Sequence, residues 1–145
     1  MRFKAAHGFS LIELMVVVVI VAILARLVVP SYTNYIQRGN ITEAIAGLSQ
    51  LRLEAERFYA DNRTYVGFTC TAPVAQSFTF SCVIPAAPTA TTITITATGI
   101  ANTNMQGFVY TINQNGDRTT TFNSVSGWTA HNPNNCWVTR QGGLC

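Results

Sequence analysis

Glu13 is the side chain whose place in the sequence suggests chemistry most directly, because it stands at the start of a long apolar run. Neither a charged nor a polar residue interrupts that run from Leu14 to Ala25. An ionisable group in such a segment is costly to bury, so it is a functional candidate by default. We expect the Glu13 carboxylate to attract an opposite charge. The alternative is that it marks the membrane-interface end of a helix.

The cysteines are the second set of reactive side chains, and they are Cys70, Cys82, Cys136 and Cys145. An even number of cysteines in an oxidising compartment favours disulfides, and three pairings are possible for four cysteines. We favour Cys70–Cys82 and Cys136–Cys145, because each pair closes a short local loop. A zinc site is the rival, but no pair has Cys-x-x-Cys spacing and neither histidine is a nearby ligand, so we expect no metal.

The sequence contains no motif of an enzyme or of a cofactor site. No glycine-rich phosphate loop follows a predicted strand, and no serine or cysteine nucleophile has a motif around it. His7 lies near the N-terminus, and His131 stands among asparagines, which is typical of a solvated loop residue. We therefore expect neither catalysis nor a cofactor.

The segment from Phe9 to Val29 has the composition of a membrane-spanning helix. It has 21 residues, and the interruptions are Ser10, Glu13 and Arg26. A helix of that length covers about 31 Å, which is one hydrocarbon thickness, and the basic residues before it favour a cytoplasmic N-terminus. An ordinary secretory signal cut near Ala25 is the alternative. The carboxylate and the amphipathic pattern that continues beyond the apolar run argue against such a signal.

We expect one helix from about Ser10 to Asp61, with an amphipathic second half at residues 31–61. Its apolar side chains recur at three- and four-residue spacing: Ile41, Ala44, Ile45, Leu48, Leu51, Ala55, Phe58 and Tyr59. Charged residues occupy the other faces as a solvated surface. Pro30 removes a backbone donor and Gly39 weakens the helix, so we expect the rod to bend or unwind between these residues.

Residues 62–145 are predicted to form a loop and then strands. The expected strands are residues 77–83, 93–98, 108–112 and 119–122, and in residues 93–98 the threonines should face solvent. Residues 113–117 contain Gly116 and predict a hairpin turn. Three or four antiparallel strands against one helix give an α+β fold, with residues 31–145 as one globular domain.

A basic leader, MRFKAAHG, followed by FSLIEL and the apolar run, closely resembles the start of the type IV pilin family, the subunits of retractile bacterial surface filaments. The resemblance is specific from Gly8 to Tyr35 and looser as far as Tyr65. Pro30 stands where the helix of the family bends. Arg26 departs from the family pattern, in which an apolar residue is more usual.

The resemblance implies a pilin fold and a processing route. A prepilin peptidase that is also a methyltransferase would remove residues 1–8 by cutting between Gly8 and Phe9, and would N-methylate Phe9. Residues 9–30 would span the inner membrane and later form the filament core, with Glu13 directing assembly. The implied partners are other pilin subunits and the pilus assembly platform, and the implied final location is an extracellular pilus that serves adhesion, twitching motility or DNA uptake.

The cysteines refine this resemblance. The Cys136–Cys145 pair resembles the disulfide that closes a C-terminal surface loop in pilins, and the additional Cys70–Cys82 pair is more like a minor pilin. A type II secretion pseudopilin is one alternative, although Asp117 is the only acid among the external strands and loops and offers little for calcium. A membrane-anchored domain that never polymerises is another alternative.

A DNA-receptor pilin of competence is the remaining alternative. The formal charge of +3 becomes +1 when Arg2 and Lys4 leave with the leader, which is a weak electrostatic basis for binding DNA. A small basic-aromatic patch could form only from Arg118, Arg140, Trp128 and Trp137. We expect the tryptophans to be core or subunit-contact residues instead.

Overall fold

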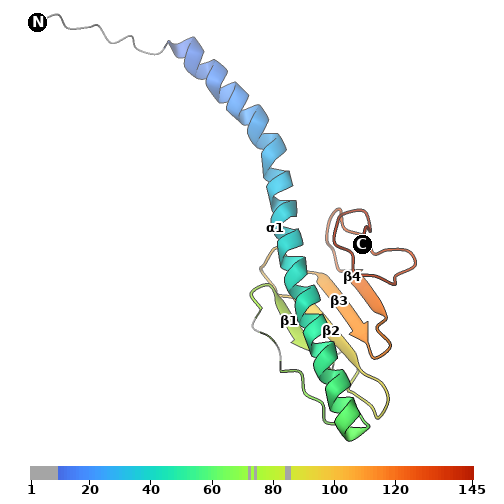
Figure 1. Ribbon diagram of the computed structural model, residues 1–145. Helices are drawn as coiled ribbons and strands as arrows, with labels where there is room; N and C mark the ends of the chain where they lie inside the picture. Colours follow the sequence, from blue (N-terminus) through green and yellow to red (C-terminus); the bar gives the residue numbers. More distant parts are fainter. Residues whose placement is uncertain (1–9, 72, 74, 84–85) are drawn as a thin grey trace, which may run out of the picture. The chain divides into compact units, whose positions relative to one another are not determined.

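The computed structural model describes residues 10–145 except positions 72, 74, 84 and 85, and of residues 27–31 it describes the backbone alone. Helix α1 (Leu11–Asn62) comes first, and four strands follow (Figure 1): β1 (Phe78–Ser81), β2 (Thr94–Gly99), β3 (Phe108–Asn113) and β4 (Arg118–Phe122). The chain divides into two compact units, a first unit, Met1–Ile36, and a second unit, Gln37–Cys145.

In the first unit, the described apolar side chains of α1 are exposed on every side of the helix. From Leu11 to Leu24 the large ones are 50–74% exposed. Within the described residues, no helix has both the length and the apolar character needed to cross a membrane. The span expected from the sequence begins at Phe9, which lies outside the described residues, as do the side chains of residues 27–29.

Helix α1 has the 52 residues expected from the sequence, displaced by a single position. Residues 30–39 are helical, so the chain does not unwind there; a bend at this place stays a prediction. The second unit begins at Gln37, whereas the sequence suggested a globular domain that begins at residue 31. The reason is that Tyr32 and Tyr35 are exposed, whereas Ile41 is a core residue.

The four strands form one antiparallel sheet in the order β1-β2-β3-β4. Tyr110 in β3 lies opposite Ala97 in β2 and Thr120 in β4, which sets the register at the centre of the sheet. The predicted hairpin joins β3 to β4. Its turn contains Gly116 at a φ of 86°, a left-handed conformation that glycine adopts without steric cost. The expected sheet and hairpin are therefore confirmed.

The amphipathic part of α1 packs against one face of the sheet and forms the core of the second unit (Figure 1). The predicted stripe is confirmed, since its fully buried members are Ile41, Ala44, Leu48, Leu51 and Ala55. Its partly buried members are Ile45, Phe58 and Tyr59. The sheet contributes Phe78, Ile95, Phe108, Tyr110 and Ile112 to the same core.

Thr96 corrects the expectation that the threonines of β2 face solvent. Thr98 is exposed, but Thr96 is only 3% exposed. It lies opposite Ser81 of β1 and Thr111 of β3. Because β2 has a neighbouring strand on each side, side chains on both flanks help to cover a residue at its middle.

Candidate functional site

Glu13 lies in the first turn of α1 and is exposed. Its backbone N–H donates to the hydroxyl of Ser10 over 3.2 Å, so Ser10 caps the helix. The spacing Ser-x-x-Glu is in itself a helix-start signal. A carboxylate in the first turn also interacts favourably with the helix dipole. The backbone therefore places Glu13 on a well-formed helix end, next to apolar side chains that have no cover in the isolated chain.

The processing residues cannot be placed in the same way. Gly8 and Phe9 lie outside the described residues, so cleavage between them and methylation of Phe9 stay predictions. For Pro30 only the helical backbone is described. Gly39 is helical, and a Cβ added there would meet nothing within 4 Å.

The structure joins Cys70 to Cys82 and Cys136 to Cys145, the pairing that the sequence favoured. The first bridge joins Cys70, in the connection between α1 and β1, to Cys82, directly after β1. Glu43 also holds this connection, because its carboxylate accepts from the backbone N–H groups of Gln76 at 2.6 Å and Ser77 at 3.2 Å. The helical pattern predicted Glu43 on a solvated face, and this role differs from that prediction. A contact between residues 33 positions apart leaves no local pattern.

The second bridge closes a C-terminal loop, and this loop and Asn134, which lies just before it, cover the edge of β4. The side-chain amide of Asn134 exchanges two hydrogen bonds of 2.9 Å with the backbone of Thr120, as a neighbouring strand would. The hydroxyl of Thr120 donates to the Cys136 carbonyl and accepts from the Val138 N–H, both at 3.0 Å. A sheet edge with unpaired backbone groups invites aggregation, and this loop occupies the edge.

Tyr110 links the same loop to the middle of the sheet. Its hydroxyl is fully buried and donates to the Val138 carbonyl over 3.0 Å. Burial raises the pKa of Tyr110 far above its usual value of 10.0. Tyr110 is therefore a neutral donor that holds the C-terminal loop against the core.

The tryptophans are core residues, as expected, and the four-residue patch does not form as one surface. Trp128 is 5% exposed and packs against Phe108 and Phe122, with ring centroids 5.0 and 5.6 Å away. Trp137 is 6% exposed, and the guanidinium of Arg118 lies 4.6 Å from its ring centroid. Because Arg118 covers a ring that is already buried, Trp137 offers no free face on which a base could stack.

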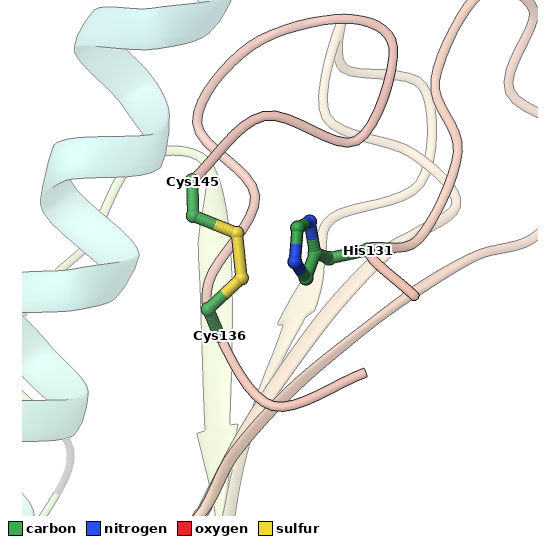
Figure 2. A group of neighbouring side chains, drawn as sticks. All are labelled: His131, Cys136 and Cys145. Atoms are coloured by element: carbon green, nitrogen blue, oxygen red, sulfur yellow. A yellow bond between two sulfur atoms is a disulfide. The ribbon is translucent and has the colours of Figure 1, made fainter. Parts of the chain in front are cut away.

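His131 corrects the expectation of a solvated loop residue. It is half-buried, and its Nδ1 lies 2.8 Å from the Gly143 carbonyl oxygen. A carbonyl oxygen only accepts, so Nδ1 carries the proton and donates. Figure 2 shows the His131 ring beside the Cys136–Cys145 bridge. The possible ligand atoms of these three residues lie within 4.8 Å of one another, but the two sulfur atoms are bonded together and so are not the thiolates that zinc binds.

Two family profiles match the chain. The profile described as "Type IV minor pilin ComP, DNA uptake sequence receptor" matches residues 30–122. The profile described as "Prokaryotic N-terminal methylation motif" matches residues 3–25. The first match covers more than half of the 145 residues, and together the two include Glu13, Gly39, Cys70 and Cys82.

Individual bacterial fimbrial proteins are also similar to this chain. A probable minor fimbrial protein of Dichelobacter nodosus is 41% identical over 64 residues, which are 44% of this chain and 40% of that protein. A fimbrial protein of Pseudomonas aeruginosa is 41% identical over 63 residues, 43% of this chain and 41% of that protein. The fimbrial protein EcpC of Eikenella corrodens is 33% identical over 104 residues, 68% of each chain. The chain thus spans about two fifths of the length of the first two relatives.

A solved structure shares the fold. The crystal structure of the Neisseria meningitidis non-core minor pilin PilV matches with a TM-score of 0.55 and 19% identity. The match covers 64% of this chain and 94% of that one. At this identity the likeness concerns the fold alone.

Proposed function

Because this chain belongs to the family of type IV minor pilins that includes the DNA uptake sequence receptor ComP, we propose that it is a filament subunit rather than an enzyme. The observation that carries the proposal is the apolar surface of α1 from Leu11 to Leu24, whose large side chains are 50–74% exposed on all sides. A helix that is apolar all round must be buried in lipid or against other protein. We assign it to lipid first and then to the filament core, with the second unit on the filament surface.

The proposed route begins in the inner membrane, with the N-terminus in the cytoplasm. The match to the N-terminal methylation motif at residues 3–25 supports cleavage after Gly8 and N-methylation of Phe9 by a prepilin peptidase. The pilus assembly platform would then pass the mature subunit to other pilin subunits. Adhesion and twitching motility are functions of the finished filament to which this subunit would contribute.

Mass spectrometry of sheared surface filaments tests this proposal. We expect the chain to be present, to begin at Phe9 and to carry one N-methyl group. A chain that begins at Met1 or after Ala25 in that material would contradict it. Deletion of the chain, scored for filaments, DNA uptake and protein secretion, separates a pilin from a secretion pseudopilin.

A second candidate function is reception of DNA at the pilus, and the family match at residues 30–122 favours it, since the profile is described by a DNA uptake sequence receptor. The second unit has six arginines and five acids from Arg38 onward, so its net charge of +1 provides little general attraction. DNA contact would therefore depend on a few arginines at defined places. Transformation with labelled DNA in the deletion strain tests this function apart from filament assembly.

A further inference from the structure

A pocket of about 380 Å³ lies between α1 and the β3–β4 hairpin, entirely within the second unit. Helix α1 contributes most of its lining, and each hairpin strand contributes one residue. The lining residues are Ser49, Arg52, Leu53, Glu56, Ile112 and Arg118. Two guanidinium groups and one carboxylate give this lining a formal charge of +1.

Arg52 lies at the pocket wall, beside the hairpin turn. A Cβ added at Gly116 would lie 2.7 Å from Arg52 Nη1, so the guanidinium lies directly against the turn there. Arg52 Nη2 pairs with Glu56 Oε1 at 2.8 Å. Arg52 Nε is buried and has no hydrogen-bond partner within the described residues. Glu56 therefore engages only part of the Arg52 guanidinium.

Arg118, the first residue of β4, is the second arginine that lines the pocket. It lies opposite Ile112 across the β3–β4 pair, and its guanidinium is held over the Trp137 ring. Arg118 is exposed, so an anion can reach it from solvent. The pocket thus presents two positioned guanidinium groups from different elements, each with donors that match an oxyanion.

We propose that this pocket binds one phosphate group of a DNA backbone, with Arg52 and Arg118 as its charged ligands. The inference rests on the second candidate function, the reception of DNA. The region that matches the DNA-receptor family, residues 30–122, contains every residue of the pocket and ends before Trp137 and Arg140. Glu56 also faces the pocket, competes for Arg52 and limits the affinity for an anion.

The test measures binding of a labelled DNA duplex by fluorescence anisotropy, with the full chain in non-ionic detergent, over a range of salt concentrations. Arg118→Gln and Arg52→Gln should each weaken binding about five-fold near about 0.15 M salt and lower the salt slope by about 1. Glu56→Gln should strengthen binding, because it removes the competing carboxylate. The control is Arg57→Gln, an exposed arginine on the same helix that does not line the pocket, which should change neither quantity.

The variants separate the possible failures. If the wild type binds DNA and both pocket variants bind it like Arg57→Gln, the site is wrong while the DNA function stands. If the wild type binds no DNA but binds inorganic phosphate or an acidic peptide in an Arg118-dependent way, the assignment to DNA is overturned. Arg118→Gln changes an exposed side chain, so its result decides the question even if Arg52→Gln lowers the melting temperature.

Discussion

Glu13 is the only acid in the first 42 residues, so no other carboxylate in the apolar part of the helix could take over its charge. Four residues of an ideal helix rise about 6 Å, so in the proposed filament a subunit displaced by about that distance would bring Glu13 level with the Phe9 amine of its neighbour. Opposite charges stabilise each other in a low-dielectric filament core. The pairing would therefore select both the partner and the axial register.

Glu13→Gln keeps the shape of the side chain and removes its charge. We expect this variant to be cleaved and inserted in the membrane but to enter filaments poorly, as measured by its amount in sheared pili against the cell membrane. Glu54→Gln is the control, since it removes an acid of the second unit, where Glu54 accepts from Gln50 at 3.0 Å. Equal incorporation of both variants would exclude the register mechanism.

Tyr110 should make stability depend on alkaline pH. Because burial raises the pKa of Tyr110 in the folded state above the usual 10.0, its contribution is fully present below about pH 10 and is lost as the pH rises above that value. The loss is up to about 1.4 kcal/mol per pH unit. Burial also raises the pKa of Tyr65, so part of the loss has another source.

Tyr110→Phe removes the hydroxyl that Val138 O accepts. We expect it to cost about 1–2 kcal/mol at neutral pH and to reduce the alkaline loss of stability. Urea unfolding at neutral pH and above pH 10 measures both effects. An alkaline loss as large as in the wild type would show that Tyr110 is not its source.

At the level of the helix, two glycines of α1 have opposite surroundings. A Cβ at Gly39 would meet nothing within 4 Å, whereas a Cβ at Gly47 would overlap the ring of Phe80 in β1. Gly39→Ala should therefore stabilise the chain by up to about 1 kcal/mol through helix propensity. Gly47→Ala should destabilise it, because the Phe80 ring must move. Thermal unfolding of the two variants compares them directly, and two shifts of the same sign would contradict the packing described for Phe80.

The C-terminal loop is an element of the core as well as a surface loop. Trp137 and Val138 lie inside the Cys136–Cys145 bridge and are buried, and Val138 accepts from Tyr110. We expect Cys136→Ser with Cys145→Ser to lower the stability of the whole second unit by about 2–3 kcal/mol.

The control is the double variant Cys70→Ser with Cys82→Ser, which removes the other disulfide, a bridge of similar loop length. Hydrogen exchange should show faster exchange in β4 for the Cys136 and Cys145 variant alone, because the loop closed by that bridge hydrogen-bonds to Thr120 in β4. Peptide mapping without reduction first verifies which cysteines are paired. A Cys82–Cys136 peptide would contradict the pairing.

On the scale of the molecule, we expect the two units to differ in whether they fold and stay soluble without detergent. The second unit contains its own core, and its first residue, Gln37, already contacts the β2–β3 loop, since its amide donates to Asn104 O over 3.1 Å. We expect a fragment of residues 37–145, made in an oxidising compartment, to be soluble and to unfold cooperatively. The full chain should need detergent because of its apolar helix.

Leu48→Asp in that fragment is the matched negative control. Leu48 is fully buried, so a charge there should prevent folding. Circular dichroism and size exclusion measure both fragments. An unfolded wild-type fragment would mean that the first unit is needed for folding.

Much of this architecture is readable in the order of residues, because it depends on local patterns. Three- and four-residue spacing predicted the stripe of α1 from Ile41 to Tyr59, and period-two alternation with a glycine turn predicted the β3–β4 hairpin. Short loops also favoured the disulfide pairing that the structure contains. Each of these signals involves residues that are close in the chain.

The remaining features join residues that are far apart in the chain, so no local sequence pattern predicts them. Glu43 holds the start of β1 from 33 residues away, and Tyr110 holds Val138 from 28. The pocket of Arg52 and Arg118 exists only because the hairpin turn folds back onto α1 at Gly116. Such contacts follow from how the helix and sheet pack, so only the folded chain reveals which polar side chains meet.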